Sequence, residues 1–148
     1  ITNVFYYMED YNSFLREKYQ RMTEKEQRFE NISVEDAQLV LVAYGISARV
    51  CKEAVRKARS QGIRLGLIRP ISIYPYPKKA FEALSQDCKA LMTVEMSITG
   101  QMAEDVKLAV DCNYPVYTYG TGIKVPKSAD VVKYAVEILD GRMDKEVF

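Results

Sequence analysis

The residues that offer chemistry in this chain follow the apolar runs that predict strands, and the first group is Gly45-Ile46-Ser47-Ala48-Arg49. A glycine and a serine at the start of a helix present free backbone N–H groups, which bind small anions. A tight turn with Ser47 as the helix N-cap explains the same residues without a ligand. A dinucleotide site is disfavoured because G-x-G-x-x-G is absent and Ile46 is β-branched.

Two charged residues end the next predicted strands. We expect Arg69 to pair with a carboxylate, either Glu95 or an acid of a partner domain. Glu95 has the position of a general base, but no nucleophile or second acid is placed to work with it, so hydrogen bonding to the loop that follows is favoured. The strand ends together form a candidate interface or anion-binding edge, made of Gly45, Ser47, Arg49, Arg69, Glu95 and Gln101, with Lys124 nearby.

The sequence lacks the groups that most catalytic and cofactor sites require. It has no histidine, no phosphate loop and no CxxC pair, and its three cysteines lie far apart, which fits a reducing cytoplasm and no disulfide framework. With 21 basic and 20 acidic residues, nucleic-acid binding is not predicted, and no apolar run approaches the ~20 residues of a membrane span. We therefore expect no catalytic, cofactor-binding or metal-binding residue, and interpret the chain as one domain of a larger enzyme.

From residue 33 to 148, strand-like runs alternate with helical patterns. The continuous apolar run at 38–44 is typical of a strand covered on both faces. The alternation predicts an α/β fold with a mostly parallel sheet and helices on both faces. The predicted strands are 38–44, 63–69, 90–95 and 115–119, and the predicted helices are 47–61, 77–85, 101–110 and 128–141.

Residues 1–32 form a different segment, which we predict to be an N-terminal helical arm or an inter-domain linker. No Gly or Pro occurs from Glu9 to Asn31, and Met8, Leu15, Met22 and Phe29 recur every seven residues, which predicts one long helix with a narrow apolar seam. The chain begins without methionine, so we expect a fragment or a processed chain.

Three strings carry a resemblance when they are taken together: LVAYGISAR at 41–49, GLIRPISIYP at 66–75, and VEM at 94–96 with GQMAEDV at 100–106. The chain resembles the second domain of the alpha subunit of 2-oxoacid:ferredoxin oxidoreductases over 36–139, nearest to the 2-oxoisovalerate (ketoisovalerate) or 2-oxoglutarate type. The resemblance implies a three-layer α/β/α sandwich like the transketolase C-terminal domain, with one antiparallel strand that the predicted strands leave unplaced.

The resemblance also implies a function for the intact enzyme, which is oxidative decarboxylation of a 2-oxoacid to an acyl-CoA with reduction of ferredoxin. Thiamine diphosphate, Mg, an iron–sulfur cluster and coenzyme A would be held elsewhere in that enzyme. This chain would then be a non-catalytic structural and assembly domain that contacts other domains of its own chain and partner subunits. The alternatives are the equivalent domain of another thiamine enzyme (a transketolase or a dehydrogenase E1 beta subunit) and a free-standing anion-binding module.

Overall fold

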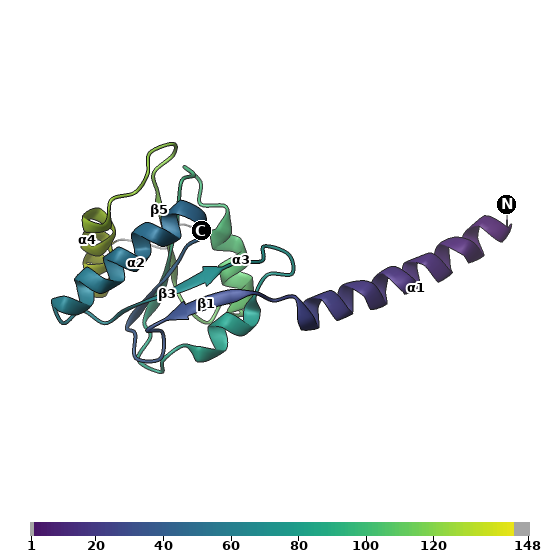
Figure 1. Ribbon diagram of the computed structural model, residues 1–148, viewed down its shortest axis with the longest axis horizontal. Helices are drawn as coiled ribbons and strands as arrows, with labels where there is room; N and C mark the ends of the chain where they lie inside the picture. The colour runs from purple at the N-terminus through teal and green to yellow at the C-terminus, as the bar shows by residue number, and fades with distance from the viewer. Residues whose placement is uncertain (1, 144–148) are drawn as a thin grey trace.

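A five-stranded sheet in the order β1-β3-β2-β4-β5 lies at the centre of the computed structural model, which describes residues 2–143 (Figure 1). The strands β2 to β5 are parallel, and β1 pairs antiparallel with β3. The four parallel strands confirm the mostly parallel sheet expected from the sequence. The strand bounds are β1 Phe29–Ile32, β2 Leu39–Val42, β3 Leu65–Pro70, β4 Ala90–Glu95 and β5 Val116–Gly120.

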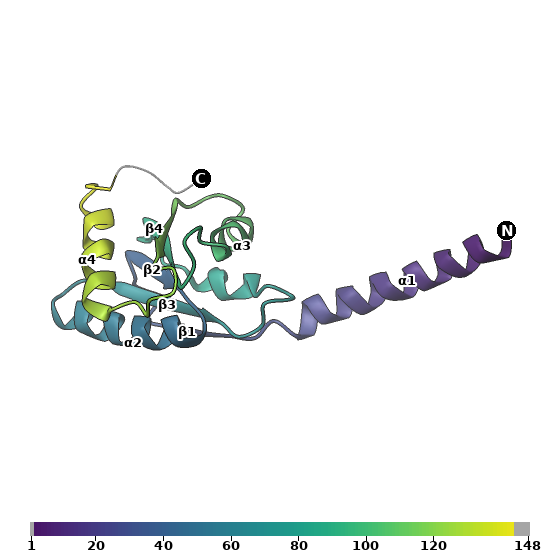
Figure 2. The ribbon, with the colours of Figure 1, turned by 90° about the horizontal axis from the view of Figure 1, so that it is seen from above.

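Helices cover both faces of this sheet and give it three layers (Figure 2). One face carries α2 (Gly45–Ser60) and α4 (Ser128–Leu139), and the other carries α3 (Met102–Ala109) and the 3-10 helix η1 (Lys78–Ala83). The layers confirm the predicted α/β/α sandwich. Among residues 2–143, no helix has the length and apolarity that crossing a membrane requires.

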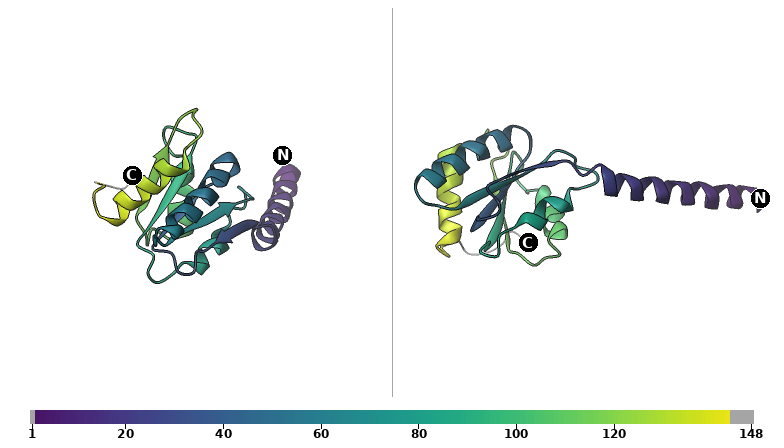
Figure 3. Two further views of the ribbon diagram at one scale, coloured as in Figure 1. Left: turned by 60° about the vertical axis from the view of Figure 1, so that its left-hand side comes forward. Right: turned by 60° about the horizontal axis from the view of Figure 1, so that its bottom comes forward.

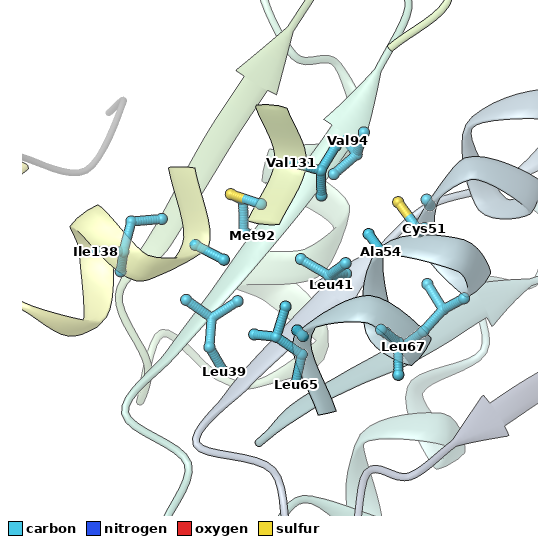
Figure 4. Close-up of a cluster of buried hydrophobic side chains, with 14 of the residues drawn as sticks. Leu39, Leu41, Cys51, Ala54, Leu65, Leu67, Met92, Val94, Val131 and Ile138 are labelled. Atoms are coloured by element: carbon cyan, nitrogen blue, oxygen red, sulfur yellow. The ribbon is translucent and has the colours of Figure 1, made fainter. Parts of the chain in front are cut away.

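Burial on both faces explains why the central strands are apolar without interruption. All four residues of β2 are fully buried, and successive side chains point to opposite faces of the sheet. Leu39 and Leu41 belong to the cluster under α2 and α4, which Figure 4 shows, while Val40 and Val42 belong to the cluster under α3 and η1. A polar residue anywhere in β2 would therefore enter one of the two cores.

The predicted helix over 9–31 is wrong at its C-terminal end. The helix α1 spans Thr2–Lys25, and Phe29–Ile32 forms β1, the antiparallel strand that the resemblance implied. Phe29 packs on one core and Ile32 on the other, and Asn31 Nδ2 donates to the carbonyl of Ala80 at 2.8 Å. Residues 29–32 form a strand because pairing with β3 and partial burial of both faces of β1 stabilise it more than the heptad spacing stabilises a helix.

The helix α1 projects away from the sheet and from the other helices, as the two views of Figure 3 show. Its contacts with the domain lie near its C-terminal half, where the rings of Tyr19 and Tyr74 meet edge to face with centroids 6.1 Å apart and Lys79 Nζ donates to the Glu24 carbonyl at 3.1 Å. Tyr7, Met8, Tyr11 and Phe14 are exposed. The division between an arm at 1–32 and a domain at 33–148 stays a prediction.

Limited proteolysis locates the start of the stable unit. Because most of α1 stands clear of the domain while β1 is hydrogen-bonded into the sheet, we expect proteinase K, which cuts after many residue types, to cleave within α1 and to leave a resistant product that begins at or before Phe29. Mass spectrometry of the product identifies its first residue. A resistant product that begins at or after Val34 would contradict the pairing of β1 in solution.

A second prediction concerns Gly66 on β3. A Cβ at this position would lie 2.7 Å from the Ser33 carbonyl oxygen and 3.1 Å from Val34 Cα, and backbone atoms of a tight turn cannot easily move away. Gly66→Ala should lower the free energy of unfolding by about 3 kcal/mol in urea titration. The control Gly62→Ala meets no atom within 4 Å and introduces only a strained positive φ, so it should cost about 1 kcal/mol. Equal losses in the two variants would contradict the close packing at Gly66.

Candidate functional site

The site lies at the point where the chain reverses the direction in which it adds strands to the sheet. The chain passes from β2 to β3 on one side and then returns to β4 on the other side of β2, so a crevice opens at the carboxyl ends of β2 and β4. A hollow of about 170 Å³ occupies this place. Its lining includes four of the six predicted site residues, and the full set is Tyr44, Gly45, Ile46, Ser47, Val94, Glu95, Met96, Ser97 and Gln101.

The N-terminus of α2 forms one wall of the hollow. The helix begins at Gly45 after an extended Tyr44, and no side chain caps it, so the prediction of Ser47 as N-cap is wrong. Ser47 lies within the first turn and is 5% exposed, and its hydroxyl has no hydrogen-bond partner in the described part of the chain. Ala48 N already donates to the Tyr44 carbonyl at 3.2 Å, so the free amides are those of Gly45, Ile46 and Ser47.

Glu95 forms the opposite wall at the end of β4 and is 2% exposed. Both of its carboxylate oxygens accept from Met102 N–H at 3.1 Å, which fixes the start of α3 and confirms the structural role favoured from the sequence. Burial raises the pKa of the Glu95 carboxyl, the hydrogen bond from Met102 opposes part of this rise, and the charge of Asp105 adds to it. Within residues 2–143, no Lys or Arg forms an ion pair with Glu95.

Arg69 pairs with a carboxylate as expected, but the partner is Glu30 on β1 and not Glu95. Arg69 Nη1 lies 3.1 Å from Glu30 Oε2, and Lys52 Nζ of α2 lies 2.8 Å from Glu30 Oε1. These two hydrogen-bonded cations lower the pKa of Glu30. The sequence missed this cluster because β1 was assigned to a helix. Arg69 therefore holds the edge strand β1 to β3, and Glu30 joins both to Lys52 of α2. Neither Arg69 nor Arg49, which is exposed on α2, lines the hollow.

A second hollow of about 220 Å³ shares Tyr44 and Gln101 with the first. Its remaining lining residues are Ile73, Tyr76, Met102 and Asp105. The Tyr76 hydroxyl is buried without a hydrogen-bond partner, and this burial raises its pKa. Tyr76 is one of several tyrosines in the predicted loops, and the sequence carries no signal that assigns it to a hollow.

Exposed apolar side chains gather at the same edge of the sheet, on the segments that follow the four parallel strands. We call this surface the carboxyl edge. Two of its side chains follow β2, three follow β3, two follow β4 and two follow β5: Tyr44 and Ile46, Ile71, Ile73 and Tyr74, Met96 and Ile98, and Ile123 and Val125. The other large exposed apolar side chains among the described residues lie on α1 and at Leu108 of α3.

The arrangement offers few reactive groups. Residues 2–143 contain no cluster of three His, Cys, Asp or Glu side chains that could hold a metal ion. Cys51 is buried, which raises the pKa of its thiol to about 12 and keeps it protonated. The edge can therefore bind and orient groups through free amides, a buried carboxylate and apolar contacts.

The raised pKa of Glu95 predicts how stability depends on pH. The folded chain holds the Glu95 proton more tightly than the unfolded chain, whose ordinary value is near 4.5, so Glu95 lowers stability as pH rises from that value through the folded pKa. Glu95→Gln removes this contribution. We therefore expect the free energy of unfolding of Glu95→Gln, relative to the unchanged chain, to increase with pH across this window.

Urea unfolding between pH 4.5 and 8 measures this difference. The control Glu104→Gln neutralises an exposed carboxylate on α3 and should change the free energy of unfolding by less than about 0.5 kcal/mol at each pH. A Glu95→Gln difference that is constant over the range, or that shrinks as pH rises, would contradict the burial of a titrating carboxyl.

Residues 37–131 match the family model "Pyruvate:ferredoxin oxidoreductase core domain II". Ketoisovalerate oxidoreductase subunit VorB of Methanothermobacter marburgensis is 49% identical over 105 residues, and VorB of Methanothermobacter thermautotrophicus is 46% identical over the same length. Each alignment covers 71% of this chain and 30% of the relative, so the chain spans less than a third of these subunits.

Solved structures share the fold at low sequence identity. A 2-oxoglutarate:ferredoxin oxidoreductase from Magnetococcus marinus superposes with a TM-score of 0.67 at 19% identity, over 80% of this chain and 21% of that one. A split-gene transketolase superposes with a TM-score of 0.59 at 19% identity, over 75% of this chain and 42% of that one. Both support the transketolase-like fold, and the family match covers most of the α/β domain. The chain belongs to the core domain II family of the pyruvate:ferredoxin oxidoreductases.

Proposed function

We propose that this chain is a non-catalytic assembly domain in the alpha subunit of a 2-oxoacid:ferredoxin oxidoreductase of the ketoisovalerate type. The single observation that carries the assembly role is the carboxyl edge, where exposed apolar side chains on four loops surround hollows without a reactive set. Large apolar side chains exposed together at one edge of a sheet mark a contact with another protein surface. The contacts are other domains of the same polypeptide and partner subunits.

The loops of the carboxyl edge are held in place before any partner arrives. The Glu95 carbonyl accepts from Thr121 N at 3.1 Å, which joins the loop after β4 to the loop after β5. Gly120 fits so closely that a Cβ would lie 2.4 Å from the Ser97 carbonyl oxygen. A surface that is already ordered loses little conformational entropy on association, which favours a permanent interface.

The reaction belongs to the whole enzyme in this proposal. The intact complex decarboxylates a branched 2-oxoacid oxidatively, forms an acyl-CoA and reduces ferredoxin in the cytoplasm. The identities of 49% and 46% to VorB subunits support the ketoisovalerate type. In this proposal thiamine diphosphate, Mg, the iron–sulfur cluster and coenzyme A are bound by other parts of the enzyme. This fits residues 2–143, where no group of three His, Cys, Asp or Glu side chains could hold a metal ion.

The alternatives fit less well. The transketolase shares the fold, but the family match and the VorB relatives belong to ferredoxin-linked enzymes. A free-standing anion-binding module is disfavoured by Glu95, because its carboxylate lines the same hollow as the free amides of α2.

Charge placed on the carboxyl edge tests the assembly role. Ile98 and Ile123 are 87% and 93% exposed, so Ile98→Asp and Ile123→Asp should leave the free energy of unfolding of the chain within about 0.5 kcal/mol. In the oxidoreductase purified with its companion subunits, each variant should weaken assembly about tenfold or more, because an aspartate would be desolvated in the interface. Size-exclusion chromatography with light scattering measures the assembly, and 2-oxoacid-dependent reduction of ferredoxin should fall in parallel.

The matched control is Leu108→Asp, which places the same charge at an apolar residue of α3 that is 64% exposed and lies outside the carboxyl edge. This variant should assemble and turn over normally. Normal assembly of both edge variants would reject the carboxyl edge as the contact surface.

A further inference from the structure

We propose that the hollow between β2 and β4 binds a primary carboxamide group, with the amide oxygen toward the N-terminus of α2 and the amide nitrogen toward Glu95. This goes beyond the assembly role, because it assigns a specific chemical group to one place on the carboxyl edge. The inference rests on three features of the hollow: its donors, its acceptor and its size.

The donors come from the first turn of α2. The N–H groups of Gly45, Ile46 and Ser47 have no acceptor within the helix, and the positive end of the helix dipole lies with them. The second and independent observation is Ser47 itself, which lines the hollow, is nine-tenths buried and has a hydroxyl without a partner in the described chain. The Ser47 hydroxyl is not one of the fully buried unpartnered atoms, and because Ser47 lines the hollow, this hydroxyl can donate to an acceptor oxygen bound there.

The acceptor is the Glu95 carboxylate. Two carboxylate oxygens offer about four lone-pair positions, and the donors to them are the Met102 N–H and the Thr93 hydroxyl. A ligand donor in the hollow would therefore find unused acceptor capacity on a side chain that is almost completely buried.

This combination selects a neutral ligand. An anion would be attracted by the α2 amides but repelled by Glu95, and a cation would be attracted by Glu95 but repelled by the helix terminus. A primary carboxamide has an acceptor oxygen and two N–H donors on one planar group without net charge. Its oxygen can accept from the α2 amides while its N–H groups donate to the Glu95 carboxylate.

The size of the hollow limits the ligand to a small group. Its volume of about 170 Å³ is well above the roughly 30 Å³ of one water and below the roughly 300 Å³ at which sites for drug-sized ligands begin. Val94, Ile46 and Met96 supply apolar contacts around the polar walls. The amide can belong to a free small molecule or to an Asn or Gln side chain of another polypeptide, and the test separates these sources.

The test is a titration of the ¹⁵N-labelled chain followed by amide NMR. Acetamide should shift the resonances of Gly45, Ile46 and Ser47 in a saturable way, and acetate should bind at least about tenfold more weakly. Glu95→Gln keeps the acceptor for Met102 N–H but removes the charge, so it should reverse the preference and bind acetate. The control Glu104→Gln, outside the hollow, should keep the preference of the unchanged chain.

A second titration uses N-acetylglutamine methylamide, which presents the primary carboxamide on a glutamine side chain. Tighter binding than acetamide assigns the site to a polypeptide, since the peptide contacts Tyr44 and Ile46 at the rim, and equal binding assigns it to a free amide. No saturable shift with either amide, or equal binding of acetate and acetamide to the unchanged chain, overturns the proposal. Because the chain is used alone, this result is independent of whether the carboxyl edge assembles with partner subunits.

Discussion

Burial of β2 and β4 on both faces is the constraint on which the rest of the structure depends. A strand without solvent on either side can satisfy its backbone only by pairing with two neighbours, so β2 must lie between β3 and β4. The parallel direction of these strands follows from helices that return the chain across the sheet. Their carboxyl ends then meet at one edge, and the loops that connect them collect there without any need for a common motif in the sequence.

The same burial places a carboxylate, that of Glu95, at the buried end of β4. The side chain follows five buried residues of β4 and remains buried itself, where a carboxylate is costly. Hydrogen bonds from Met102 N–H and from the Thr93 hydroxyl offset part of that cost, and the first of them also sets where α3 begins. The residue is thus a structural element and a binding group at once, and no nucleophile accompanies it in the hollow.

The parallel strands, and the helices that alternate with them along the chain, were predicted well from the sequence, because continuous apolar runs of strand length leave few other interpretations. The sequence also placed Gly45, Ser47, Glu95 and Gln101 at one edge, since the carboxyl ends of parallel strands always share it. It failed at β1, where Phe29 continues a seven-residue spacing that suits a helix but the sheet needs an edge strand. Arg69 was then assigned the wrong partner, because Glu30 becomes its neighbour only through the antiparallel pairing. Ser47 was assigned as a cap because its type fits that role, and side-chain type alone does not fix the first residue of a helix.

The joint between α1 and β1 determines where the helix leaves the domain. The Arg28 carbonyl accepts from Ile71 N at 2.9 Å, Arg28 N donates to Ser72 Oγ at 3.0 Å, and Lys79 N donates to Gln27 Oε1 at 3.0 Å. The base of the projecting helix is therefore fastened to the segment after β3, which carries Ile71, Ile73 and Tyr74. The helix therefore leaves the domain from the carboxyl edge, and a partner bound to its C-terminal half would lie beside Tyr74, which Tyr19 of the helix already contacts.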